Sequence, residues 1–233
     1  MKSIPLLILT FFLFSCQTLP LIKSPVSPAD ENALTCPSPF LKEKYRLVHA
    51  IETRVAGRTQ SAIIGVTVAD PSTRSLSCAI MTAEGMVLFE AESGPGALKV
   101  NRALPPFDSE DFAKNMIEDI KLIFFAPEGK IQVKGYLPDG STACRYFEEN
   151  GDLIDVIGNK STGTEIKRYS YSGALKRHIS FNKTAKNIYE RIELLANEQF
   201  NYSLLMTLIE AQPVKSELLK KRKTRKISKV KSP

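Results

Sequence analysis

The sequence lacks the motifs on which most enzyme active sites depend. It contains only two histidines, His49 and His178. It has no Gly-x-Ser-x-Gly nucleophile motif, no His-Glu-x-x-His zinc motif and no glycine-rich phosphate loop. His178 alternates with Lys176 and Ser180 in a strand-like run, which places it on a solvent face. We therefore expect no catalytic residue, no metal site, no cofactor and no enzymatic activity.

The sequence also lacks an apolar run of the roughly 20 residues that a membrane-spanning helix requires. The apolar run 4–14, preceded by Lys2, instead has the length and charge of a signal peptide. It ends in Leu13-Phe14-Ser15-Cys16, which resembles the lipobox of bacterial lipoproteins. The resemblance implies that residues 1–15 are removed as a signal peptide, that a diacylglycerol is attached to Cys16, and that the new N-terminus is acylated, for example with palmitate.

Gln17 follows the cysteine. In the sorting rule of proteobacterial lipoproteins, an aspartate at this position retains the protein in the inner membrane. Gln17 therefore implies a lipid-anchored protein of the outer membrane that faces the periplasm. An uncleaved N-terminal anchor and a signal cut by the ordinary signal peptidase are the alternatives.

Cysteine is scarce, and no pair has the C-x-x-C spacing of a redox or zinc site. After Cys16, three cysteines remain, so at least one thiol has no partner within the chain. Cys78 and Cys144 lie in strand-like runs, where a free cysteine usually packs as a small buried hydrophobe. A Cys78–Cys144 disulfide is the alternative, which the periplasm permits. Cys36 has no role that the sequence identifies.

Acidic residues are almost absent from residues 214–233, which carry nine Lys or Arg against Glu217. The formal net charge of +7 therefore belongs to this end, and the rest of the chain is nearly neutral. Because like charges repel, we expect residues 213–233 to form a disordered tail. Anionic lipid, lipopolysaccharide or cell-wall polymer is its expected ligand, and nucleic acid is not; a solvated tail without a partner is the alternative. The candidate binding residues are Lys220, Lys221, Arg222, Lys223, Arg225 and Lys226.

Prolines recur in residues 16–40, which is typical of an extended tether that lifts a domain off the membrane. Residues 41–212 have the composition of one globular domain. Its first segment, 40–55, predicts a short helix rather than a strand, with His49 as a packing residue. From Ser61 the hydrophobic period changes to two, with Ile64 and Val66 on one face, which predicts a strand with one buried face.

One amphipathic helix is predicted over residues 108–126. Asp108 is its expected N-cap, and Phe107 and Phe112 have the spacing of a hydrophobic staple. Pro127 ends it near Ala126. Its apolar stripe includes Phe112, Met116, Ile117, Ile120, Ile123 and Phe124.

Turn residues after this helix separate a series of short strands. Pro138-Asp139-Gly140 and Ser172-Gly173 interrupt strand-like runs, and Asn150-Gly151 predicts a type I′ hairpin turn. We count eight to ten strands, mostly linked as hairpins. The predicted fold class is mainly β (α+β), a curled antiparallel sheet or half-open β-barrel with the central amphipathic helix covering the concave side.

This order of elements, with the lipobox, a Pro-Pro-Phe-Asp segment before the helix and a closing strand that begins Phe200-Asn201-Tyr202, resembles the LolA and LolB superfamily of lipoprotein carriers and receptors. The resemblance covers residues 41–212. It implies an apolar cavity that holds the acyl chains of lipoproteins or lipids in transit. The alternative is a non-enzymatic envelope lipoprotein with a filled core that docks a protein or an anionic surface. The candidate cavity-lining residues are Ile80, Met86, Leu88, Phe112, Met116, Ile120, Phe124, Tyr202, Leu204 and Met206.

Overall fold

The computed structural model describes residues 19–25, 33–55, 58–159, 163–182, 188–197 and 201–214. The predicted signal peptide, Cys16 and the basic residues of the predicted tail lie outside this set. Among the described residues, no helix is long and apolar enough to cross a membrane, and no cluster of His, Cys, Asp and Glu could hold a metal ion.

The described chain forms one antiparallel sheet of twelve strands, and the order across the sheet is β5-β4-β3-β2-β1-β12-β11-β10-β9-β8-β7-β6. The first five strands run outward from the centre to one edge, and the last seven return from the other edge to pair β12 with β1. The strands are β1 (Tyr45–Val55), β2 (Arg58–Asp70), β3 (Ser75–Met81), β4 (Val87–Gly94), β5 (Ala97–Ala103), β6 (Lys130–Tyr136), β7 (Thr142–Phe147), β8 (Leu153–Asn159), β9 (Gly163–Tyr169), β10 (Leu175–Asn182), β11 (Arg191–Ala196) and β12 (Tyr202–Pro213).

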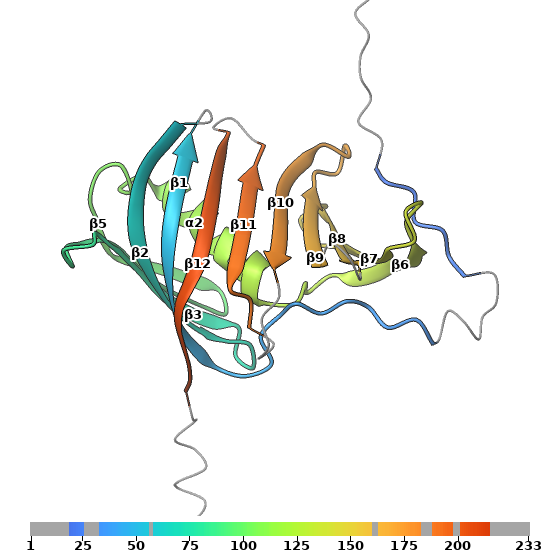
Figure 1. Cartoon of the computed structure of the whole chain (residues 1–233), viewed down its shortest axis with the longest axis horizontal. Coiled ribbons are helices and arrows are strands. Elements are labelled where there is room, and N and C mark those ends of the chain that lie inside the picture. The colour runs from blue at the N-terminus through green and yellow to red at the C-terminus, as the bar shows by residue number, and fades with distance from the viewer. Residues whose placement is uncertain are drawn as a thin grey trace, which may run out of the picture.

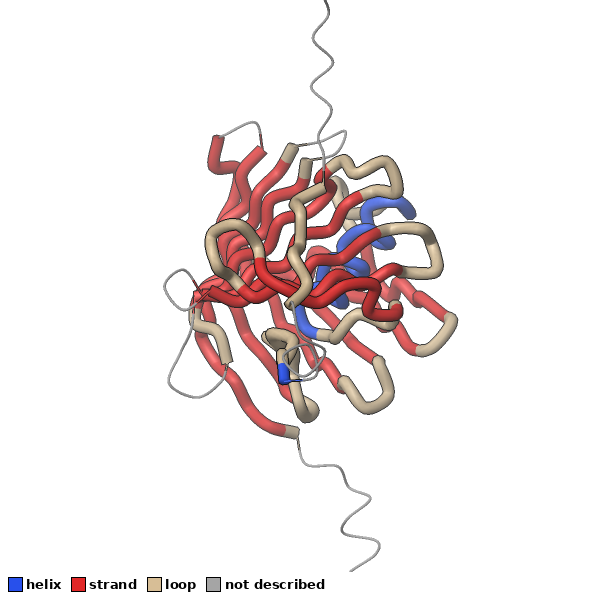
Figure 2. The backbone as a smooth tube through the Cα atoms, turned by 90° about the vertical axis from the view of Figure 1, so that its right-hand side faces the viewer, coloured by secondary structure: helices blue, strands red, loops and turns tan. Residues whose placement is uncertain are grey.

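This topology places the long helix α2 (Glu110–Phe124) across the sheet. Because β5 and β6 are the two edges, the segment between them must cross from one edge to the other. The sheet curls, and α2 lies on its concave side (Figures 1 and 2). The predicted curled sheet with helical cover is confirmed, with more strands than the sequence pattern suggested.

The prediction of a helix over residues 40–55 is wrong, because Tyr45–Val55 forms β1 at the centre of the sheet. Its side chains alternate, and Leu47 and His49 are buried on the concave face. The strand pairs with β2 on one side and with β12 on the other. Two ladders of backbone hydrogen bonds therefore override a weak helical pattern.

The helix is confirmed but begins and ends differently from the prediction. Its N-cap is Ser109 rather than Asp108, and the Ser109 hydroxyl accepts a hydrogen bond from the Phe112 backbone N–H at 3.2 Å. The rings of Phe107 and Phe112 pack edge to face with centroids 5.2 Å apart, so the expected contact forms from different cap positions. The last helical residue is Phe124 rather than Ala126.

Four hairpins share one turn in which a glycine has a left-handed backbone. In the β7–β8 connection, Gly151 (φ 86°) donates its N–H to the Glu148 carbonyl, and the Glu148 N–H bonds to the Asp152 carbonyl. This is the three-residue hairpin in which a glycine follows a type I turn, so the type I′ prediction for Asn150-Gly151 is wrong. Gly85, Gly140 and Gly173 repeat the pattern.

The described parts of the Pro-rich segment lie against the sheet, which corrects the prediction of a free tether. Lys23 pairs with Tyr136 at the β6 edge through two backbone hydrogen bonds of 2.9 Å. Ile22 is buried and packs with Ala143 and Ile157 on the convex face. A Cβ on Gly135 would lie 2.1 Å from the Lys23 carbonyl oxygen, so glycine is required for this close approach.

Residues 33–41, which we call the strap, are tied to the sheet by a Cys36–Cys144 disulfide. The expectation that Cys144 is a free buried thiol and the alternative Cys78–Cys144 pairing are therefore both wrong. Cys78 is free and buried, as predicted. Burial raises the pKa of its thiol to about 12.

Candidate functional site

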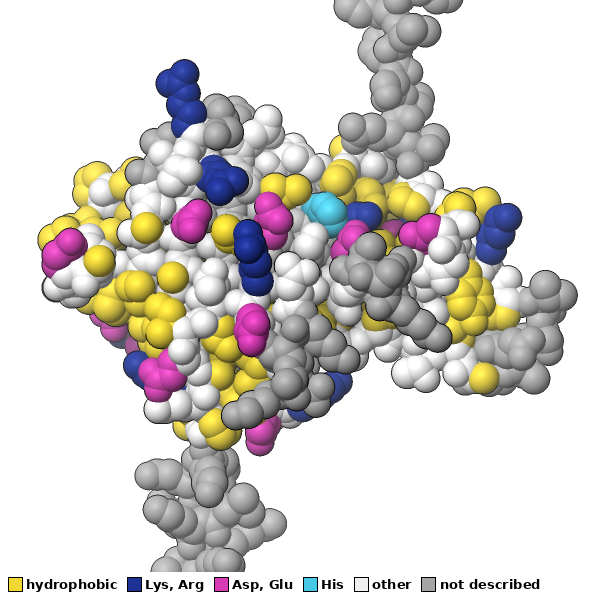
Figure 3. Space-filling model, viewed as in Figure 1, with side chains coloured by type: hydrophobic (Ala, Val, Ile, Leu, Met, Phe, Trp, Pro, Cys, Tyr) yellow, Lys and Arg dark blue, Asp and Glu magenta, His cyan; other side chains and the backbone are white. Residues whose placement is uncertain are grey.

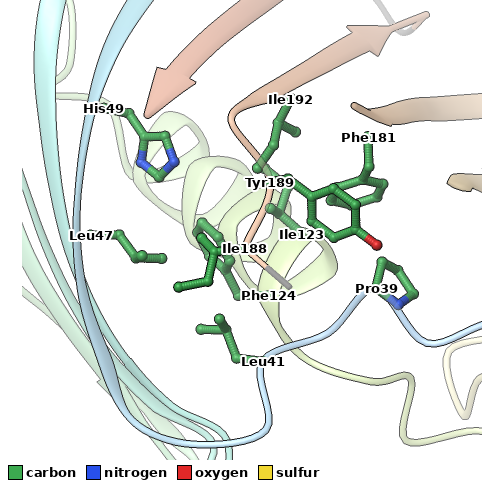
Figure 4. Close-up of a pocket in the computed structure, with 10 residues that line it drawn as sticks. All are labelled: Pro39, Leu41, Leu47, His49, Ile123, Phe124, Phe181, Ile188, Tyr189 and Ile192. Atoms are coloured by element: carbon green, nitrogen blue, oxygen red, sulfur yellow. The ribbon is translucent and has the colours of Figure 1, made fainter. Parts of the chain in front are cut away.

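A narrow cavity lies between α2 and the concave face, at the rim where the strap meets β1 (Figure 4). Its volume of about 10 Å³ has room for about one water molecule, far below the ~300–1,000 Å³ of typical small-molecule pockets. The lining comes from the strap, β1, α2, β10, β11 and the chain leading into β11. It consists of Pro39, Leu41, Leu47, His49, Ile123, Phe124, Phe181, Ile188, Tyr189 and Ile192.

Of the described lining residues, His49 and Tyr189 carry the polar side-chain groups. His49 is 2% exposed, and its ring lies 6.1 Å from that of Phe124 between centroids. Among the described residues it makes no side-chain hydrogen bond and no ion pair. Burial lowers the pKa of His49 to about 4 from its ordinary value of 6.5, so the imidazole is neutral at neutral pH.

The predicted cavity-lining residues fall into three groups in the structure. Phe124 lines the cavity, and Ile80 and Met206 are buried in the hydrophobic core without lining it. The prediction is wrong for Met86 and Phe112, which lie at the surface and are 55% and 37% exposed. The half-buried members that pack against the core are Leu88, Met116, Ile120, Tyr202 and Leu204.

A buried polar cluster joins the middle of α2 to the sheet. The Arg177 Nε on β10 donates to the Asp119 Oδ1 at 2.7 Å, and the Tyr202 hydroxyl on β12 donates to the Asp119 Oδ2. The Arg177 guanidinium also lies over the Tyr202 ring, 5.8 Å from its centroid. Burial raises the pKa of the Asp119 carboxyl, while the Arg177 charge and the Tyr202 hydrogen bond act to lower it.

Two further contacts hold α2 at the rims of the sheet. The Arg168 side chain on β9 bonds to the Asp152 Oδ2 at 2.7 Å and reaches the Glu118 Oε2 on α2 at 3.4 Å. At the other end, Arg74 between β2 and β3 donates to the Ala126 carbonyl at 2.8 Å and lies over the Phe125 ring. The polar contacts of α2 with the sheet are therefore few and side-chain mediated, and the rest of its interface is apolar.

The convex face carries hydrophobic side chains as well. On β2 the buried face consists of Ile63, Gly65, Thr67 and Ala69, so the more aliphatic row faces outward. Figure 3 shows hydrophobic side chains in this part of the convex face. We define the convex patch as the half-buried residues Val48, Ile64, Val66 and Val68, of which Val48 and Val66 are paired between β1 and β2.

Sequence reasoning missed the most informative residues of the interior. Asp119 follows Glu118 on a helix with many charges, and only the roll of α2 decides which of the two is buried. The one sequence signal that Asp119 is buried is its position beside Met116 and Ile120 on the apolar stripe. His49 was expected to pack, but on a helix rather than on a central strand.

No family model matches the sequence, and no curated protein sequence matches it. The fold does match solved structures. A LolA superfamily protein from Nitrosomonas europaea superposes with a TM-score of 0.50 at 11% sequence identity, over 76% of this chain and 89% of that one. A proposed outer membrane lipoprotein-sorting protein domain from Vibrio parahaemolyticus gives a TM-score of 0.40 at 12% identity, over 79% and 90%. The chain is thus similar in fold to the LolA superfamily protein from Nitrosomonas europaea.

Proposed function

We propose that this protein binds the acyl chains of lipoproteins or lipids between its curled sheet and α2, and acts in their transport or localisation at the outer membrane. The observation that carries the proposal is the apolar concave face, which is covered by one helix and a strap rather than by a second sheet. Such an interior is what a carrier requires, because an acyl chain loses about 0.8 kcal/mol per CH₂ on transfer to water.

Binding requires the interior to open, since the cavity as described holds about one water molecule. The helix is the element to move, because no strand pairs with it and its polar contacts are the few described above. A buried chain of sixteen carbons contributes roughly a dozen kcal/mol, which can offset the separation of α2 from part of the sheet. The ion pair between Asp119 on α2 and Arg177 on β10 forms again when α2 packs back onto the sheet.

Anchoring is the second part of the proposal. Lipidation at Cys16 holds the domain at the periplasmic face of the outer membrane, and the basic residues from Lys220 to Lys226 add affinity for anionic lipid, lipopolysaccharide or cell-wall polymer. A Cys16→Ala chain is expected to stay unprocessed and to lose its lipid anchor. Processing and membrane attachment at wild-type level in this variant would contradict the lipobox assignment.

Photo-crosslinking tests the carrier function. The full chain is exposed in membranes to an acyl probe with a photoreactive group at the chain end, and labelled peptides are mapped by mass spectrometry. We expect labels on concave residues such as Phe124 and Ile192, and loss of these labels in Ile192→Phe, which fills the cavity. Val66→Thr on the convex patch is the matched control and should label normally. Labelling confined to the convex patch, or none, would reject the carrier function.

The convex patch favours a second candidate, a non-enzymatic scaffold that docks a protein partner. Val48, Ile64, Val66 and Val68 form an aliphatic surface on the outside of the sheet, and the nearly filled interior agrees with a structural core. This candidate predicts no label on the concave face. The same crosslinking map therefore separates the two functions.

A further inference from the structure

We propose that His49 donates a hydrogen bond to the ester carbonyl at the head of a bound acyl chain, and thereby makes the interior selective for acyl esters over plain hydrocarbon. This inference rests on the acyl-chain binding proposed above and names its recognition residue. It pairs the His49 imidazole with the ester group, which is the polar group at the head of an esterified acyl chain.

The placement of His49 points to a ligand. The side chain projects from β1 toward α2 (Figure 4), and its ring lies 6.1 Å from that of Phe124 between centroids. It is 2% exposed and makes no hydrogen bond or ion pair within the described part of the chain. The cavity next to it is lined mainly by aliphatic and aromatic side chains. A polar group buried without a partner normally costs stability, so a ligand that bonds to it gains affinity.

The charge of the imidazole determines which ligand groups His49 can bind. A neutral histidine offers one N–H donor and one acceptor nitrogen. Among the described residues, no Asp, Glu, Lys or Arg lines the cavity. A phosphate or a carboxylate in this site would be a buried anion without a counter-charge, which is strongly unfavourable. An ester carbonyl is neutral, accepts one hydrogen bond and is attached directly to a hydrocarbon chain.

The hydrocarbon of such a ligand has an apolar surface to follow. Beyond His49 the concave face continues to Ile51, which is paired with Met206 on β12. Both side chains belong to the core that α2 covers. With the carbonyl at His49, the hydrocarbon would lie along these residues between the sheet and α2.

Competition against the photoreactive probe tests the inference in the full chain in membranes. The competitors are a fatty-acid methyl ester and an alkane of equal length, and the readout is the concentration that halves labelling of concave residues. We expect His49→Leu to raise this concentration about fivefold for the ester, equivalent to one hydrogen bond of about 1 kcal/mol, and to leave the alkane unchanged. His49→Gln, which keeps an N–H donor, should retain most of the ester preference.

His178→Leu, at the other histidine of the chain and on the convex face, is the matched control and should behave as wild type. Two further competitors, a triacylated cysteine lipopeptide and a phospholipid, identify the source of the ester, because the natural one will show the His49-dependent shift. Equal shifts for ester and alkane in His49→Leu, or none, would overturn the role of His49 while leaving the carrier function intact. Absence of concave labelling in the wild type would remove both.

Discussion

Reduction of the Cys36–Cys144 disulfide is expected to destabilise the domain and to loosen the strap around Cys36. The two cysteines are 108 residues apart, and closing a loop of about 100 residues stabilises by about 4.7 kcal/mol in the chain-entropy model. Removal of native disulfides typically costs about 2–5 kcal/mol. We expect a loss in this range, because Phe40 stays buried and Leu41 keeps its backbone hydrogen bond to Phe124 after reduction.

Urea unfolding of the Cys16→Ala chain with and without reductant measures this loss. Hydrogen exchange under native conditions should show that protection of the strap falls first, because the disulfide is its covalent tie to β7. Cys78→Ala is the matched control, since Cys78 is free and the variant should keep the full difference between oxidised and reduced protein. An unfolding midpoint that reductant leaves unchanged would refute the reasoning.

Three other outcomes follow from buried groups. His49 binds a proton below about pH 6.5 in the unfolded chain but only below about pH 4 in the folded chain. The free energy of unfolding should therefore fall by about 3 kcal/mol as pH drops through this window. Urea unfolding at several pH values measures this fall, which His49→Leu should remove. Asp155→Ala leaves Arg145, which bonds to both Asp155 oxygens at 2.7 Å, without its buried partner, and should cost about 3–5 kcal/mol; a loss below 1 kcal/mol would show that the pair is solvated. Gly135→Ala should displace the segment around Lys23 and raise its hydrogen exchange, and unchanged exchange would contradict the close contact.

Local patterns were sufficient for much of the fold. The apolar stripe from Phe112 to Phe124 and the glycine turns mark elements whose signals lie within a few residues of each other, so the helix and most hairpins could be predicted. β1 could not, because its conformation is fixed by β2 and by β12, and the residues of β12 that pair with β1 lie 147 to 168 positions later in the chain. The side of β2 that faces the core also depends on a neighbouring strand, because the missing Cβ of Gly65 leaves room for Ile51 on β1.

The candidate site was harder to predict than the fold. Phe124 is the only predicted lining residue that reaches the cavity. The cavity lies at the rim where the strap meets β1, whereas the other predicted residues lie earlier on α2 or on and next to β3, β4 and β12. The strap residues Pro39 and Leu41 come from a segment that reads as a tether. Their place in the lining depends on the disulfide at Cys36, and a sequence with three remaining cysteines does not say which two are joined.

The central claim is that the interior opens to hold an acyl chain. Mass spectrometry of the purified Cys16→Ala chain tests it most directly, because this variant lacks the predicted lipid attachment site, so acyl groups found with it are bound ligands. The account predicts co-purified acyl esters, up to about one molecule per chain, that Ile192→Phe no longer retains. Protein that carries no acyl ligand, or that retains the same amount in Ile192→Phe, would contradict it.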